Sequence, residues 1–411
     1  MSYLFNDQVQ FKGNAVDAFN RLKVSAPFTL FDSQNRYQMN DKWDTFGATG
    51  GTATFAVLES AINMTVGTTA GSKVTRETKR VFPYQPGKSL LVLNTFAMNT
   101  PKDGLLQRVG YFGITGGATA SVPFNGIYLQ QDGLTMSMCL ASASLGNTIT
   151  VNQSNWNGDK FDGNGESGRT LDPTKGNIMW MDIEWLGVGD VRTGFIVDGR
   201  PIVAHTFHND NLNPTTYMTT AILPIRYELM NTKGQTGSST MKQICSSVIS
   251  EGGYEGFSRR HNVTHNGATL KTLTTAGVQY PIIALRLNSN RLDSVVVPSN
   301  INAVIQETSN NKPNTAQYRI LFNPSISGGS WVTHYNGNVD YNNTMASITG
   351  GTDIIGGYIS SSGSLVISDV NDFNFQIGRT QLGVSDVIVF TMTPIYDGAK
   401  ICADFSWFEI I

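Results

Sequence analysis

The sequence carries little charge. Lysine, arginine, aspartate and glutamate make up 15% of its 411 residues and leave a net charge of −2, whereas soluble domains usually contain about 25% charged residues. A nearly neutral chain without a large basic region has no general attraction for phosphate backbones, so we expect no nucleic-acid partner. Its surface must consist largely of neutral polar side chains.

Cysteines and long apolar runs are also scarce. The three cysteines, Cys139, Cys245 and Cys402, lie far apart without a CxxC pair, so no zinc or redox motif is indicated and buried free thiols are expected. The first residues lack a basic segment followed by an apolar one, and no later run reaches the ~18 apolar residues that span a bilayer. We therefore expect a soluble chain that begins near Met1 and does not insert into membranes.

No common catalytic motif is present. The sequence contains no GxSxG, Walker or HExxH pattern, each of which would mark a known kind of chemistry. On this basis we predict that the protein is not an enzyme and has no cofactor.

What the sequence has in abundance is turn residues between short strand-like runs. It contains 42 glycines, and asparagine, serine and threonine favour turns over helices. The pattern predicts an all-β protein made of two antiparallel β-sandwich or jelly-roll domains. The glycine-rich stretch that starts at residue 251 breaks the periodicity, so we place one domain at 31–250 and a C-terminal domain at 256–411.

Residues 1–30 differ from the rest and form a predicted docking arm. Ala15, Ala18, Phe19 and Leu22 follow a helical spacing after Asn14, which indicates a short amphipathic helix. So short a helix must dock its apolar stripe on something. Phe19 and Leu22 are the expected contacts, either with the chain's own domain or with a neighbouring subunit.

The stretch MDIEWLGVGDVRTGFIVDGRPIVAHTF, residues 181–207, is the most catalytic-looking part of the chain. Its period of two predicts three antiparallel strands, with turns at Gly189-Asp190 and Asp198-Gly199. Asp182 and Glu184 share one strand face, where they could form an acid/base pair. Because Arg192 on the next strand offers Asp182 an ion pair, we favour a scaffold role.

Other polar residues offer binding hypotheses. His205 and His208 should face opposite sides of a strand, which disfavours a shared metal. Asp162, Asn164 and Glu166 have the alternating spacing of calcium ligands, although a hydrogen-bonded loop is the favoured interpretation. The basic run with Lys73, Arg76, Lys79, Arg80 and Lys88 is interpreted as a solvated strand face, or else as a surface for an acidic partner.

Several whole phrases carry a resemblance. DAFNRLKVSAPFTLFDSQNRY, TRETKRVFPYQPGKSL, QSNWNGDKFDGNG and WMDIEWLGVGDVRTGF resemble virion structural proteins of tailed bacteriophages of the marine and cyanobacterial type, over roughly residues 15–255. The 181–207 stretch is also similar to the meander of concanavalin-like jelly rolls.

The resemblance implies a non-enzymatic virion protein, made in the host cytoplasm and located on the tail or the outer capsid surface. Its partners would be other virion proteins and further copies of itself. Tail, baseplate or fibre attachment is the first hypothesis, and capsid decoration or a head fibre is the second. A glycan-binding host-recognition module is a further alternative, for which Trp156 and Tyr335 are the candidate exposed aromatics.

Overall fold

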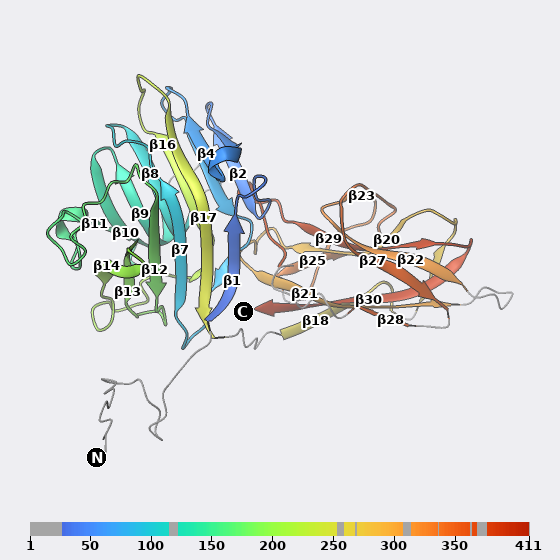
Figure 1. Cartoon of the computed structure of the whole chain (residues 1–411). Helices are drawn as coiled ribbons and strands as arrows, with labels where there is room; N and C mark the ends of the chain where they lie inside the picture. The colour runs from blue at the N-terminus through green and yellow to red at the C-terminus, as the bar shows by residue number, and fades with distance from the viewer. Residues whose placement is uncertain are drawn as a thin grey trace, which may run out of the picture.

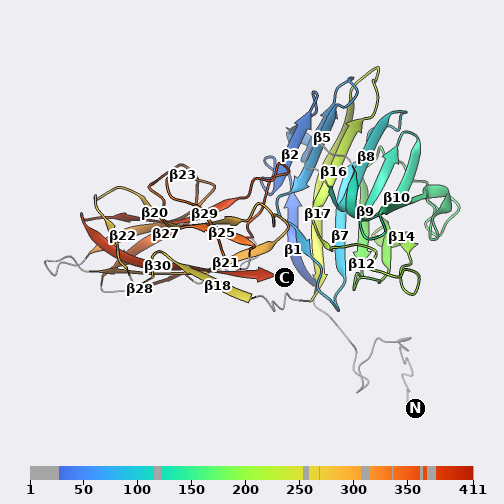
Figure 2. The same cartoon turned by 180° about the vertical axis from the view of Figure 1, so that it is seen from behind.

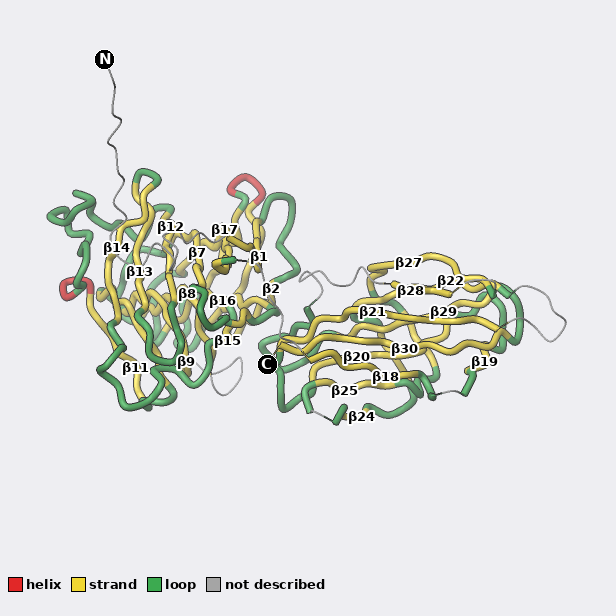
Figure 3. The backbone as a smooth tube through the Cα atoms, turned by 90° about the horizontal axis from the view of Figure 1, so that it is seen from below, coloured by secondary structure: helices red, strands yellow, loops and turns green. Residues whose placement is uncertain are grey.

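The protein is built almost entirely of β-strands. The computed structural model describes residues 27–114, 122–252, 259–267, 269–306, 314–335, 337–361, 364–367 and 376–410. Within these ranges the only helical turns are two 3₁₀ segments, Val57–Glu59 and Gln153–Asn155, and no helix is long and apolar enough to cross a membrane. The predicted all-β class is confirmed (Figures 1 and 3). The proposed arm at 1–30, with Phe19 and Leu22, lies mostly outside the described residues, and β1 begins at Pro27.

Two facing sheets form the first body, drawn from blue to yellow in Figure 1. One sheet has the order β14-β13-β12-β7-β17-β4-β3, with β1 also paired to β17; its strands are β14 (Arg200–Phe207), β13 (Val191–Val197), β12 (Asn177–Ile183), β7 (Leu90–Ala97), β17 (Ser239–Glu251), β4 (Ala61–Val66), β3 (Thr52–Ala56) and β1 (Pro27–Gln34). The other has the order β11-β10-β9-β8-β16-β5-β2; its strands are β11 (Asn147–Asn152), β10 (Thr135–Ser142), β9 (Pro123–Asp132), β8 (Leu105–Ile114), β16 (Ile225–Asn231), β5 (Lys73–Thr78) and β2 (Trp43–Ala48). We call them the eight-stranded and the seven-stranded sheet.

Strand alternation builds the core between these sheets. Met179, Met181 and Ile183 of β12 are fully buried in it, while the residues between them point to the other side of the sheet. Two sheets that each bury one apolar face against the other form a β-sandwich.

A second body contains the strands from β18 onward (yellow to red in Figure 1). Its five-stranded sheet has the order β18-β30-β21-β28 with β19 also on β30; the strands are β18 (Arg259–Thr264), β30 (Ala399–Ile410), β21 (Val295–Gln306), β28 (Ser364–Ile367) and β19 (Lys271–Leu273). Its six-stranded sheet has the order β24-β25-β20-β29-β22-β27; the strands are β24 (Val332–Thr333), β25 (Val339–Asn342), β20 (Tyr280–Leu287), β29 (Val387–Pro394), β22 (Thr315–Phe322) and β27 (Thr352–Ser360). A two-stranded antiparallel sheet of β23 (Ser325–Ser327) with β26 (Ser347–Thr349) completes the body.

The predicted three-stranded meander is confirmed as β12-β13-β14. Its second turn is at Asp198 and Gly199, both with positive φ, as predicted. The prediction for the first turn is wrong, because Leu186 and Gly187, not Gly189 and Asp190, take positive φ. Gly189 instead donates its N–H to the carbonyl of Trp185 at 2.7 Å, which closes a tight loop.

The two bodies meet where the end of β30 approaches the first sandwich (Figures 1 and 2). An apolar cluster joins them: Val81 and Ile222 from the first body pack with Val295, Val297 and Ile410 from the second. Ile222 belongs to the short strand β15 (Ile222–Leu223), which pairs with β6 (Phe82–Pro83). The segment 376–386 adds polar contacts beside this cluster, as described below.

Candidate functional site

The outer face of the eight-stranded sheet holds the most distinctive surface feature of the first body. Trp180 and Asp182 alternate with the core residues of β12 and therefore lie on this outer face. Trp180 is directly opposite Leu93 of β7 and Gly194 of β13. Asp182 is opposite Leu91 and Arg192 in the same ladder. An aromatic, an acid and a base are thus brought together by strand register.

These residues line a groove with two connected parts. The larger part, about 480 Å³, is mostly apolar and includes Leu91, Leu93, Trp180, Ile196 and Ile249. The smaller part, about 210 Å³, is polar; Tyr84, Gly87, Lys88, Ser89, Asp182, Glu184, Asp190, Arg192 and Glu251 line it. Both parts share Ser89, Asp182, Arg192 and Glu251. We call the whole the sheet-face groove; an apolar floor with a few polar groups is the usual composition of a ligand site.

Three buried polar atoms of the groove lack a hydrogen-bond partner among the described residues. They are Nε1 of Trp180, a side chain with 6% exposure, Oδ1 of Asp182 and the hydroxyl oxygen of Tyr84. The other carboxylate oxygen of Asp182 forms the predicted cross-strand ion pair with Arg192, which is confirmed. Because buried polar groups are nearly always hydrogen-bonded, an unpartnered donor and an unpartnered acceptor two positions apart on one strand face indicate a place for the polar groups of a ligand.

Negative charge dominates the polar part of the groove. Asp190 is held by His208, whose Nδ1 lies 2.8 Å from its Oδ2, and Glu251 accepts the N–H of Ser89 at 3.3 Å. Burial and the negative charges of Glu184 and Glu251 raise the pKa of Tyr84, so this phenol stays protonated and can donate a hydrogen bond. The lining therefore suits neutral or cationic ligands better than anionic ones.

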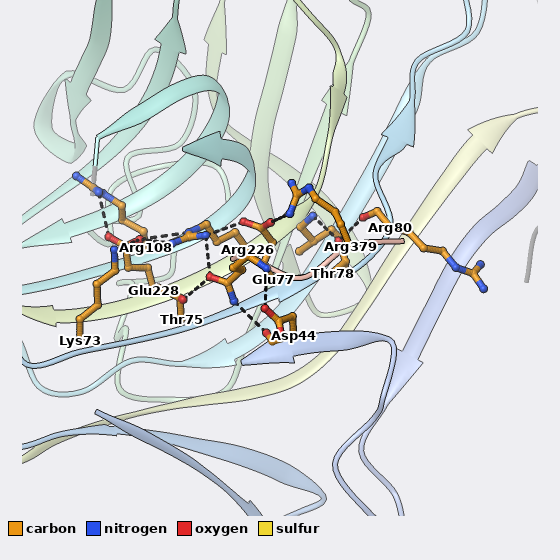
Figure 4. A network of polar contacts seen from close by, with 12 residues as sticks. Asp44, Lys73, Thr75, Glu77, Thr78, Arg80, Arg108, Arg226, Glu228 and Arg379 are labelled. Atoms are coloured by element: carbon orange, nitrogen blue, oxygen red, sulfur yellow. Dashed lines mark hydrogen bonds and ion pairs between the residues drawn. The ribbon is translucent and has the colours of Figure 1, made fainter. Parts of the chain in front are cut away.

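A second polar cluster, on the outer face of the seven-stranded sheet, joins the two bodies (Figure 4). Arg226 of β16 lies between Glu77, at 2.6 Å from Nη1, and Glu228, at 3.1 Å from Nη2. Arg379 of the second body donates to the other oxygen of Glu77 at 2.6 Å. Gln381 accepts from Thr75 at 2.5 Å. We call this cluster the junction network.

The junction network corrects the interpretation of the basic run as a solvated strand face. All six residues of β5 are buried, Lys73 and Arg76 included. Lys73 lies 3.7 Å from Glu228 on the outer face. Arg76 points into the sandwich core, where it donates to Gln243 at 2.5 Å, and burial lowers its pKa to about 10. Burial alone would lower the pKa of Arg226, but Glu228 and Glu77 together raise it.

Of the two aromatics expected on the surface, only one is exposed. The expectation for Trp156 is wrong: its side chain is 1% exposed, packs with Phe195 and donates Nε1–H to the carbonyl of Val151 at 3.0 Å. Its polar neighbours in sequence belong to a loop that wraps this indole into the core. Tyr335 is 76% exposed, and its glycan contact stays a prediction.

The acidic loop and the two histidines have ordinary partners. Asp162 accepts the N–H of Asn164 at 2.9 Å, and Asp159 accepts the N–H groups of Phe161 and Ser167, so the carboxylates organise the loop backbone. The calcium hypothesis for Asp162, Asn164 and Glu166 stays a prediction. His205 is buried in β14, and His208, one residue beyond the end of this strand, is exposed.

Comparisons with known proteins find no family and only solved structures of low similarity. Neither a family model nor a curated protein matches the sequence. Similar solved structures include the carbohydrate-recognition domain of Emp47p, with 12% identity, a TM-score of 0.35, and 55% of this chain and 95% of that chain covered. An endo-1,3-β-glucanase from Streptomyces sioyaensis has 12% identity and a TM-score of 0.39, with 57% of this chain and 99% of that chain covered. A carbohydrate esterase from bacteriophage phi24B has 11% identity and a TM-score of 0.33, with 56% of this chain and 100% of that chain covered. At these values the likeness assigns no function to this chain.

The comparisons correct one prediction. We expected a protein that is not an enzyme, but a glucanase and an esterase are among the similar structures. The absence of common catalytic motifs therefore does not exclude an enzyme for a chain of this fold, and the prediction is withdrawn.

Proposed function

We propose that the sheet-face groove of the first body binds a neutral or amino-sugar glycan. The observation that carries this proposal is the presence of two buried polar atoms without partners among the described residues. They are the donor Trp180 Nε1 and the acceptor Asp182 Oδ1, two positions apart on one face of β12. A sugar hydroxyl can accept from the first and donate to the second at once. Leu91, Leu93 and Ile249 offer the apolar surface on which the C–H face of a sugar ring packs.

The charge of the groove narrows the ligand class. Asp182, Glu184, Asp190 and Glu251 outnumber the two basic lining residues, Lys88 and Arg192. An anionic polysaccharide would be repelled, whereas a neutral hydroxyl-rich or protonated amino sugar would not.

A glycan array tests the proposal. Full-length protein should bind neutral or amino-sugar glycans in preference to sulfated, sialylated or phosphorylated ones, and D182N should lose that signal. An array on which only anionic glycans bind, or on which D182N binds like the unmodified protein, would overturn it.

The same carboxylates support a second candidate function, glycoside hydrolysis. Asp182, Glu184, Asp190 and Glu251 surround one small pocket, and glycosidases use a pair of carboxyl groups, one acid and one base or nucleophile. Release of reducing ends from a glycan that binds the groove, lost in both D182N and E184Q, would favour hydrolysis. Binding without release would leave recognition as the function.

The setting we propose is a tailed-phage particle, on the basis of the phrases shared with virion proteins. A glycan-binding protein of a virion would meet its ligand on the host surface, and residues 1–30 would attach the chain to the particle. Deleting residues 1–26, which precede β1, should then abolish incorporation into particles while leaving both β bodies folded. Normal incorporation of the truncated chain would contradict this.

A further inference from the structure

Three metal-ligating side chains come together in the second body. His261 lies on β18 and Glu409 on β30, in the five-stranded sheet, while His334 directly follows β24 of the six-stranded sheet. One ligand atom from each lies within 4.8 Å of the other two. Among the described residues this is the only such group of three.

Strand register explains how two of the three meet. His261 is directly opposite Trp407 in the β18-β30 pair, and Glu409 is two residues further along β30. The side chains of His261, Trp407 and Glu409 therefore share one face of the five-stranded sheet. His261 Nε2 lies 3.7 Å from Glu409 Oε2.

The third residue, His334, lies in a tight turn. His334 donates its N–H to Val339 at 2.8 Å and accepts from the N–H of Gly337 at 2.8 Å, so the turn fixes its backbone. The centroid of its ring lies 5.0 Å from the ring centroid of His261 and 5.0 Å from that of Trp407, and both contacts are edge-to-face. The two sheets thus present imidazoles to one carboxylate from different sides.

Neighbouring side chains orient the carboxylate. Glu409 Oε1 accepts from Trp407 Nε1 at 2.7 Å, and Oε2 accepts from Asn338 Nδ2 at 2.8 Å. A carboxylate oxygen has two lone pairs, so an oxygen that accepts a hydrogen bond can also bind a cation. Hydrogen bonds of this kind, made to the ligand by residues behind it, are typical of metal centres. His261 and Glu409 are 4% and 1% exposed, so a cation bound there would be shielded from water.

We propose that His261, His334 and Glu409 bind a divalent transition-metal ion of the zinc class. Two imidazole nitrogens and one carboxylate form a donor set that suits zinc and its neighbours, whereas calcium prefers oxygen ligands throughout. Ligand distances of about 2.0–2.2 Å place the ligand atoms roughly 3–4 Å apart, which small side-chain rotations achieve from the separations observed. The ion would join the turn at His334 to β18 and β30, and leave a coordination position for a further ligand.

Calorimetric titration of the untagged full-length protein with Zn²⁺, with Co²⁺ absorption as a spectroscopic probe, tests this site. We expect one ion per chain, and roughly 100-fold weaker binding or more in H334A. H208N, which changes an exposed histidine outside the group, should bind as the unmodified protein does. Ca²⁺ should not compete.

A second variant guards against a folding defect. E409Q keeps the size of the side chain but removes its charge, and it should also lose the Co²⁺ absorption bands while its near-ultraviolet circular dichroism matches that of the unmodified protein. Equal Zn²⁺ affinity in H334A and the unmodified protein, or no Zn²⁺ binding by the latter, would overturn the proposal. Neither outcome bears on glycan binding by the first body.

Discussion

Arg379 of the second body donates a hydrogen bond from Nη1 to Oε1 of Glu77 at 2.6 Å, across 302 residues of sequence. The same carboxylate receives Arg226 on its other oxygen at 2.6 Å. A single buried acid therefore serves both the first sandwich and its junction with the second body (Figure 4).

Replacing Glu77 should destabilise the protein strongly. In E77A the buried guanidinium of Arg226 loses one of its two carboxylates and Arg379 loses its partner, and breaking a buried pair costs about 3–5 kcal/mol. Urea denaturation measures the change. The exposed pair Arg169–Asp198, 58% and 75% exposed, provides the control: R169A should cost less than about 1 kcal/mol. Equal effects of E77A and R169A would contradict the importance of the junction network.

The close approach of β13 and β14 should make Gly194 intolerant of a side chain. A Cβ at this position would lie 1.9 Å from the carbonyl oxygen of Ile202, so G194A must shift the meander and should lose about 1–3 kcal/mol of stability. Gly176 has open space around it, and G176A should stay within about 0.5 kcal/mol. Thermal unfolding of both variants checks the prediction; a G194A as stable as G176A would refute it.

The stability of the protein should fall as the pH drops below about 6.5. Burial, with a contribution from His208, lowers the pKa of His205 to about 4 in the folded state. Between the ordinary histidine value of ~6.5 and this value the unfolded chain binds the extra proton, so acid favours unfolding. The contribution is fully present above pH ~6.5 and is lost toward pH ~4, on the order of 2–3 kcal/mol.

H205N isolates the contribution of His205. Its free energy of unfolding, measured by urea titration from pH 4 to pH 7, should vary less than that of the unmodified protein. Some dependence should remain, because burial also lowers the pKa of His265 to about 4. Identical pH profiles for H205N and the unmodified protein would show that His205 does not titrate as described.

Local pattern predicted the strands well and the contacts between distant segments poorly. Alternation in residues 177–207 is enough to predict the meander and the ion pair of Asp182 with Arg192, because both partners lie on adjacent strands of one hairpin. Nothing near Lys73 or Arg76 indicates that β5 is buried, since their partners Glu228 and Gln243 lie far along the chain. The burial of a basic run becomes visible only when the fold brings its distant partners, such as Glu228, next to it.

The candidate sites show the same limit. Asp182 and Glu184 were recognised from the sequence as neighbours on one face, but Trp180 and the apolar floor from β7 and β17 become a groove only through strand order. Trp156 looked exposed because its neighbours are polar, and the loop folds it inward. His261, His334 and Glu409 have no motif spacing, and only the facing sheets bring them together.

Replacing the indole of Trp180 with a phenyl ring, which removes the N–H donor, should weaken glycan binding. W180F keeps an aromatic ring on the groove floor but loses the donor, so a glycan hydroxyl would lose one hydrogen bond, worth about 0.5–1.5 kcal/mol, or roughly 2- to 10-fold in affinity. Calorimetric titration with the strongest glycan from the array measures the loss. Y358A removes an exposed aromatic of the second body, 69% exposed, and should leave the affinity unchanged.

The most direct test of the glycan-binding groove is the same titration with D182N. The variant keeps the shape of the side chain but replaces the buried acceptor charge beside Trp180, and we predict at least roughly 10-fold weaker binding, with a melting temperature close to that of the unmodified protein. A glycan affinity that is the same in D182N and the unmodified protein would show that the sheet-face groove is not the binding site.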